Sequence, residues 1–132
     1  PHRGETFSPL PNGEGPGVGF TEKAAEYGIA DTGWSTQAAF FDYDKDGDLD
    51  LYILNATNED RQPNRIKPKV LDGNSPANDH FYRNDNGKFT EIHTDAGILD
   101  DGWGLGISVN DFNNDGWEDL YISNDFLAND LL

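Results

Sequence analysis

The chain has 132 residues, carries a formal net charge of −16 at neutral pH and contains neither cysteine nor methionine. A chain of this length forms one domain or part of one, and its negative charge disfavours binding to nucleic acids and to anionic membrane surfaces. The lack of cysteine excludes disulfide bonds, cysteine-ligated zinc and thiol catalysis, and no apolar run reaches the roughly 18 residues that would indicate a membrane span.

The N-terminal segment is rich in proline and glycine and lacks hydrophobic periodicity, so we expect an irregular lead-in. An internal repeat follows: residues 20–55 align without a gap on residues 89–124, at an offset of 69, and 16 of the 36 aligned positions are identical. One supersecondary unit is therefore expected twice. The expected organisation is a lead-in at 1–19, a first repeat at 20–92 with an insertion at 56–78, and a second, truncated repeat at 93–132.

Each repeat is expected to begin with two antiparallel strands. The first strand is predicted at 35–42 and again at 104–111, both short and rich in small residues. The second is predicted at 48–55 and 117–124, which alternate with Leu, Tyr and Ile in a pattern typical of a strand. An acidic loop joins the two strands in both repeats.

Two more strands are predicted in the first repeat, at 80–83 and 88–92, because Asn86-Gly87 between apolar runs is a strong hairpin signal. Four antiparallel strands describe one blade of a β-propeller. The predicted fold is therefore all-β, with about two four-stranded blades that belong to a larger propeller or are completed by self-association. We also expect an outer strand at 18–23 and the start of a further strand at 128–132.

The two acidic loops share the pattern D-x-[DN]-x-D-G-x-x-D, which points to Ca²⁺, a hard cation that takes 6–8 oxygen ligands. Like charges at this spacing repel one another unless a cation lies among them. The candidate ligands are Asp42, Asp44, Asp46, Asp48 and Asp50 in the first loop, and Asp111, Asn113, Asp115, Trp117 and Asp119 in the second. Asp48 and Trp117 are expected to contribute backbone carbonyl oxygens. The pattern is not an EF-hand, because the twelfth position is Ile53 or Ile122 instead of glutamate.

The loops and the Leu-Tyr-Ile strands that follow them resemble FG-GAP/VCBS repeats, the calcium-binding blades of integrin α-subunit propellers. The longer context, from FTE through AGI and GWG to DFNNDGWEDLYISNDF, looks closest to the branch that includes cartilage acidic protein and ASPIC/UnbV proteins. The resemblance covers 20–55 and 79–132. It implies a propeller with two Ca²⁺ sites, and it leaves the biological role open.

The leading functional hypothesis is a calcium-binding structural or recognition module that is extracellular, surface-located or periplasmic, and no catalytic residues are assigned. Any protein or glycan partner is expected on the face opposite the loops, where the insertion carries Arg61, Arg65, Lys67 and Lys69. One alternative is the propeller of a polysaccharide-active enzyme. Another is a self-assembling protein that forms homo-oligomers through unpaired strands. The histidines His2, His80 and His93 are widely spaced in the sequence, so no histidine site is expected.

Overall fold

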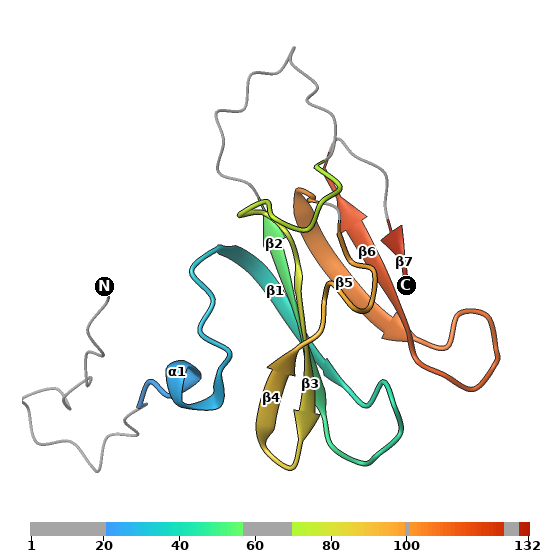
Figure 1. The fold of residues 1–132 in the computed structure, drawn as a ribbon. Helices are drawn as coiled ribbons and strands as arrows, with labels where there is room; N and C mark the ends of the chain where they lie inside the picture. The colour runs from blue at the N-terminus through green and yellow to red at the C-terminus, as the bar shows by residue number, and fades with distance from the viewer. Residues whose placement is uncertain (1–20, 57–69, 100, 126–129) are drawn as a thin grey trace, which may run out of the picture.

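Two antiparallel sheets make up the described part of the chain (Figure 1). The computed structural model describes residues 21–56, 70–99, 101–125 and 130–132. The four-stranded sheet has the order β1-β2-β3-β4, with β1 at Trp34–Phe41, β2 at Asp50–Ala56, β3 at His80–Asp85 and β4 at Lys88–Glu91. The three-stranded sheet has the order β5-β6-β7, with β5 at Gly104–Asn110, β6 at Asp119–Asn124 and β7 at Asp130–Leu131.

The predicted all-β class is confirmed, and the six strands expected inside the two repeats lie within a few residues of their predicted positions. The sheets do not close on each other, so the arrangement is a pair of neighbouring sheets and not a ring (Figure 1). No helix in the described ranges is long and apolar enough to cross a membrane.

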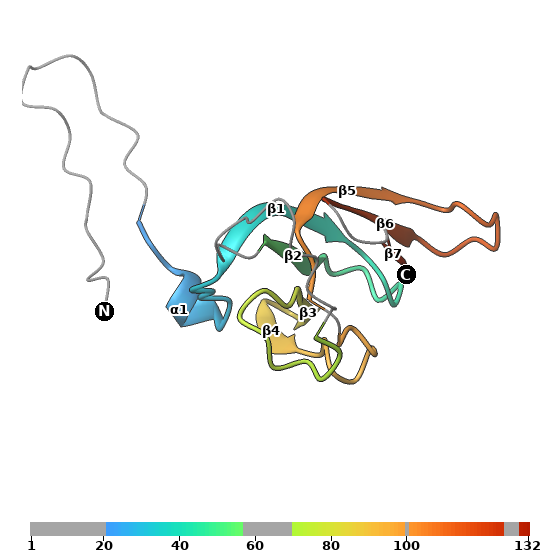
Figure 2. The same cartoon turned by 90° about the horizontal axis from the view of Figure 1, so that it is seen from above.

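The hydrophobic core lies between the two sheets, which stack as layers (Figure 2). Along β2, Tyr52 and Leu54 point into this core, whereas Leu51 and Ile53 point to the opposite face. In β6 the assignment is reversed, because Leu120 and Ile122, the repeat equivalents of Leu51 and Ile53, enter the core. The core residues are Phe41, Tyr52, Leu54, Phe81, Ile98, Leu120 and Ile122. The two sheets therefore use opposite faces in this contact: the face of the first sheet that carries Tyr52 and Leu54, here called its front, packs on the back of the second sheet.

The two sheets approach each other closely at Gly104, at the start of β5. A Cβ atom placed there would lie 2.4 Å from the Leu54 side chain and 2.7 Å from the Asn55 carbonyl oxygen. Thr36 in β1 donates its hydroxyl to the Gly104 carbonyl at 3.0 Å. Glycine is thus required sterically at this position.

The segment before β1 differs from the expectation. Residues 21–23 form no strand, and residues 18–20 lie outside the described ranges. The chain instead forms a short helix, α1 (Ala24–Tyr27), which ends at Gly28 with φ 78°. A strand needs a hydrogen-bonded neighbour, and within the described chain this segment satisfies its backbone locally instead: the Ile29 N–H donates to the Ala24 carbonyl at 2.9 Å.

The final strand forms as predicted but pairs in a different register. Residues 128–132 (ANDLL) resemble residues 77–81 (ANDHF), so Leu132 aligns with Phe81. Tyr52 lies opposite Phe81, whereas its repeat equivalent Tyr121 lies opposite Leu131 and not opposite Leu132. The pairing is therefore shifted by one residue. β7 has only two residues and pairs with β6 alone, so fewer contacts fix its register than fix that of β3.

Candidate metal centre

The first acidic loop joins β1 to β2 and brings three carboxylates together. Asp42 follows β1 directly and Asp50 begins β2, so the strand pair holds both ends of the loop in place. Asp42, Asp44 and Asp50 each offer a carboxylate oxygen, and these oxygens lie within 4.8 Å of one another. Three of the predicted ligands are thus already gathered at one point.

Backbone N–H groups inside the loop hold these carboxylates in position. The two oxygens of Asp42 accept hydrogen bonds from the N–H groups of Asp46 and Gly47, each at 3.1 Å. Lys45 and Gly47 have positive φ angles of 61° and 95°, which fold the chain back on itself. The turn brings the Asp44 carboxylate close to those of Asp42 and Asp50.

Asp50 is fully buried, which is unusual for a carboxylate beside other acids. It accepts hydrogen bonds from the N–H of Tyr43 at 3.0 Å and of Asn84 at 2.8 Å. Burial raises the pKa of Asp50, and the nearby Asp44 and Asp46 charges add to this effect, although the two backbone hydrogen bonds oppose it. A cation in the loop would favour the ionised form that these N–H donors also favour.

The second loop, between β5 and β6, repeats the hydrogen bonds of the first. Asp111 accepts from the N–H groups of Asp115 at 3.0 Å and Gly116 at 2.8 Å, and Asp119 accepts from Phe112 N–H at 2.9 Å. Among the described residues, a group of three acids is found in the first loop but not here, because the third position is Asn113. The second loop therefore has the same backbone form and one charge fewer at that position.

Other predicted ligands form hydrogen bonds to backbone N–H groups within the loops or beside them. Asp46 and Asp115 each accept a hydrogen bond from the N–H two residues later, at 2.8 and 2.9 Å. The Asp48 carboxylate accepts from the N–H of Asn86 in the β3–β4 turn at 2.6 Å. This places the Asp48 side chain on the neighbouring hairpin, and its role as a carbonyl ligand, like that of Trp117, stays a prediction.

Asn84 is a supporting residue that sequence reasoning missed. Besides its bond to Asp50, it donates its side-chain amide to the Leu49 carbonyl at 2.9 Å and accepts from Gly87 N–H at 2.7 Å. It therefore ties the end of the acidic loop to the β3–β4 turn. The available signal was its position three residues before the glycine of the predicted turn.

The two loops are neighbours. Lys45 of the first loop places its Nζ atom 3.8 Å from the centre of the Trp117 ring in the second, a cation–π contact. Both candidate sites thus lie at the same end of the molecule.

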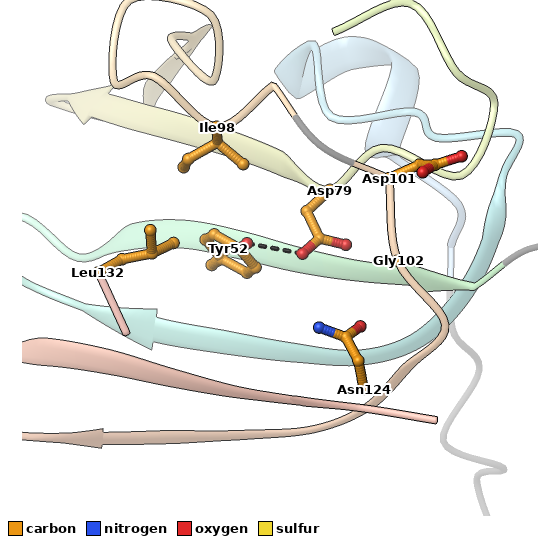
Figure 3. Close-up of a pocket in the computed structure, with 7 residues that line it drawn as sticks. All are labelled: Tyr52, Asp79, Ile98, Asp101, Gly102, Asn124 and Leu132. Atoms are coloured by element: carbon orange, nitrogen blue, oxygen red, sulfur yellow. Dashed lines mark hydrogen bonds between the residues drawn. The ribbon is translucent and has the colours of Figure 1, made fainter. Parts of the chain in front are cut away.

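A small polar pocket lies between the sheets, towards the end opposite the loops (Figure 3). Tyr52 donates its hydroxyl to Asp79 at 2.7 Å, and the other Asp79 oxygen accepts from Asn55 N–H at 2.8 Å. Both oxygens of this buried carboxylate are engaged, so its evident role is to join β2 to the start of β3. The predicted partner residues Arg61, Arg65, Lys67 and Lys69 lie outside the described ranges.

No family model, curated protein or solved structure matches this chain. Its function is therefore inferred from the residues and their geometry alone.

Proposed function

We propose that this chain is a Ca²⁺-stabilised segment of a β-propeller, and that it serves as a structural or recognition module in an extracellular, cell-surface or periplasmic setting. The observation that carries the proposal is the convergence of Asp42, Asp44 and Asp50, with Asp50 fully buried. Repulsion among these groups is relieved by a divalent cation.

The donor set favours calcium over softer metals. The candidate ligands in both loops are carboxylate, amide and carbonyl oxygens, and flexible sets of such oxygens suit Ca²⁺. Asp42, Asp44, Asp46 and Asp50 would bind through side chains and Asp48 through its carbonyl, with Asp111, Asn113, Asp115, Asp119 and the Trp117 carbonyl in the second loop. The ion supplies positive charge here, and no reaction is assigned to it.

The stacking of the sheets supports the propeller. Each sheet comes from one repeat, and the core is made by the front of the first sheet and the back of the second. Repetition of this front-to-back contact is how blades follow one another around a propeller axis. The resemblance to FG-GAP/VCBS repeats points the same way.

Calcium binding is tested by thermal unfolding of the chelator-treated protein with and without excess Ca²⁺. A ligand that binds only the folded state at 100 times its dissociation constant stabilises by about 2.7 kcal/mol, so we expect the melting temperature to rise by several degrees. Titration calorimetry should give two Ca²⁺ per chain. An unchanged melting temperature together with no heat of binding would sink the proposal.

A matched pair of substitutions assigns the effect to the loop. Asp42→Asn removes one of the three converging carboxylates, at a position that is aspartate in both loops, and should weaken binding at the first site only, leaving one tight Ca²⁺. Asp95→Asn, at an exposed carboxylate outside both loops, should behave as the wild type. Equal loss of binding in both variants would mean that net charge, and not the loop, attracts the ion.

Self-association is a second candidate, favoured by the outer face of the second sheet. Tyr121, Leu131 and Phe112 are 40%, 62% and 46% exposed there, whereas Tyr52, the repeat equivalent of Tyr121, is 1% exposed beneath the second sheet. Another sheet stacked in the same sense would cover this face. Sedimentation equilibrium tests the idea, and a monomer at all accessible concentrations would refute it.

A further inference from the structure

Two histidines and a glutamate come together at the open end of the β3–β4 hairpin, away from the acidic loops. The Nδ1 atom of His80 lies 2.5 Å from Glu91 Oε1, and the Nδ1 atom of His93 lies 2.8 Å from the same oxygen. One ligand atom from each of the three residues lies within 4.8 Å of the others. The expectation that these histidines are scattered is therefore wrong for His80 and His93, whose ring centres are 5.7 Å apart.

The hairpin itself brings the three side chains together. Asn86 and Gly87 have φ angles of 55° and 85°, as in a two-residue type I′ turn, and this turn pairs Asp85 with Lys88. The same register places Tyr82 opposite Glu91, and a 2.7 Å hydrogen bond from Ile92 N–H to the Phe81 carbonyl extends it. His93 lies two residues beyond the end of β4, and its ring centre is 5.7 Å from that of His80. The strand pair therefore holds His80 and Glu91, and the segment that follows β4 brings His93 to them.

The Nε2 atom of each histidine has a polar neighbour outside the group. This neighbour favours the ring orientation in which Nδ1 faces the centre of the group. His80 Nε2 lies 3.5 Å from Asp31 Oδ1, and His93 Nε2 lies 3.2 Å from the Thr94 hydroxyl. Histidines that bind metals commonly hold the other ring nitrogen on a carboxylate, a carbonyl or another polar group, which fixes the orientation of the ring.

The environment of the His93 Nδ1 atom supports a ligand at this group. The atom is buried and forms no hydrogen bond, although Glu91 Oε1 lies 2.8 Å away as an ion-pair neighbour. A buried nitrogen without a hydrogen bond is costly in a folded protein. A metal ion among the three ligand atoms would bond to this nitrogen and also balance the charge of Glu91.

We propose that His80, Glu91 and His93 form a binding site for a divalent transition metal of the Zn²⁺ class. Two imidazoles and one carboxylate suit Zn²⁺ and its neighbours, whereas Ca²⁺ prefers oxygen ligands alone. Neighbouring ligands around tetrahedral zinc lie roughly 3.4 Å apart for bonds of about 2.1 Å. Glu91 Oε1 lies 2.5 and 2.8 Å from the two nitrogens, so metal binding requires this partly exposed side chain to move outward by about 1 Å or less. Glu91 is 39% exposed, so a fourth position is open to water or to an external ligand.

The site is independent of the acidic loops, and its test is run with those loops saturated. Zn²⁺ is titrated calorimetrically into chelator-treated full chain in the presence of excess Ca²⁺. We expect one Zn²⁺ per chain at micromolar affinity or better, and tetrahedral visible absorption when Co²⁺ replaces Zn²⁺. Failure of Zn²⁺ binding with Ca²⁺ binding intact would overturn this inference and leave the proposed function standing.

The chain has three histidines, of which two belong to the proposed site, so the third serves as a control. His80→Gln and Glu91→Gln should each weaken Zn²⁺ binding at least tenfold, whereas His2→Gln should not change it. Asp31→Asn should weaken it by about 10–100-fold, as expected of a residue that orients a ligand.

Because a variant could lose its fold, NMR of the wild-type chain is the second measurement: Zn²⁺ should shift the ring signals of His80 and His93. Binding that shifts neither ring, or that survives both ligand variants, contradicts the proposal.

Discussion

Tyr82 illustrates how one residue can make stability depend on pH. It is 4% exposed in the centre of β3, directly opposite Glu91. Burial raises its pKa to about 12, and the negative charges of Glu91 and Asp31 add to this effect. The folded chain therefore holds the phenolic proton more tightly than the unfolded chain, whose tyrosine titrates near its ordinary value of 10.0.

The sign of the effect follows from linkage. Stability from the raised pKa is fully present below pH 10 and is lost as the pH rises towards 12, by roughly 2–3 kcal/mol at most. Urea unfolding of the wild type and of Tyr82→Phe, measured from pH 8 to about pH 12, isolates this contribution, because phenylalanine has no proton to lose. We expect the wild type to lose more stability than the variant over this range. Parallel profiles would show that Tyr82 titrates normally.

The contact between β5 and the first sheet depends on the absence of a side chain at Gly104. Gly104→Ala would place its Cβ 2.4 Å from Leu54, which lies in the core and cannot move away freely. Overpacking of this kind costs about 1–3 kcal/mol. Gly106→Ala is the matched control in the same strand, since its Cβ would meet the Ser123 hydroxyl at 3.2 Å and the end of Gln37 at 3.6 Å. Chemical denaturation should show a clearly larger loss for Gly104→Ala, and equal losses would refute the close approach.

The strands show what the sequence could predict. The alternation in β2 and β6 and the Asn86-Gly87 turn are local signals, and they place the strands and the hairpin register correctly. The conformation of the acidic loops could also be predicted, because it depends on the spacing of the acids and on glycines within nine residues of sequence. The group of His80, Glu91 and His93 was not predicted, because spacing along the chain does not show that the hairpin brings the start of β3 close to the end of β4.

Other features depend on contacts that no local pattern reports. Residues 21–23 do not form the predicted strand and lead into the helix α1, whose backbone bonds close locally, and the β7 register is set by weak pairing at one edge. The burial of Asp50 could not be predicted, because it depends on the β3–β4 hairpin, which packs over the loop and supplies the Asn84 N–H. These features arise when elements meet, so they appear only in the folded chain.

At the level of the whole chain, the two sheets share one core and should unfold together. Ile122 in β6 is 1% exposed and belongs to the same cluster as Tyr52 and Leu54 in β2. Ile122→Ala should therefore cost about 2–5 kcal/mol and destabilise both sheets. Native-state hydrogen exchange distinguishes this outcome, because amide protection should fall in β2 as much as in β6.

The matched control is Ile53→Ala, at the repeat equivalent of Ile122. Ile53 is 9% exposed and packs on the other face of the first sheet, with Leu51 and Tyr82. If the sheets form one cooperative unit, both variants lower protection throughout the described strands, in proportion to their effect on global stability. If the sheets were independent units, Ile122→Ala would lower protection in β5 and β6 alone and Ile53→Ala in β1 to β4 alone. The shared core favours the first outcome, because its side chains come from β1, β2, β3 and β6 and neither sheet keeps that face buried without the other.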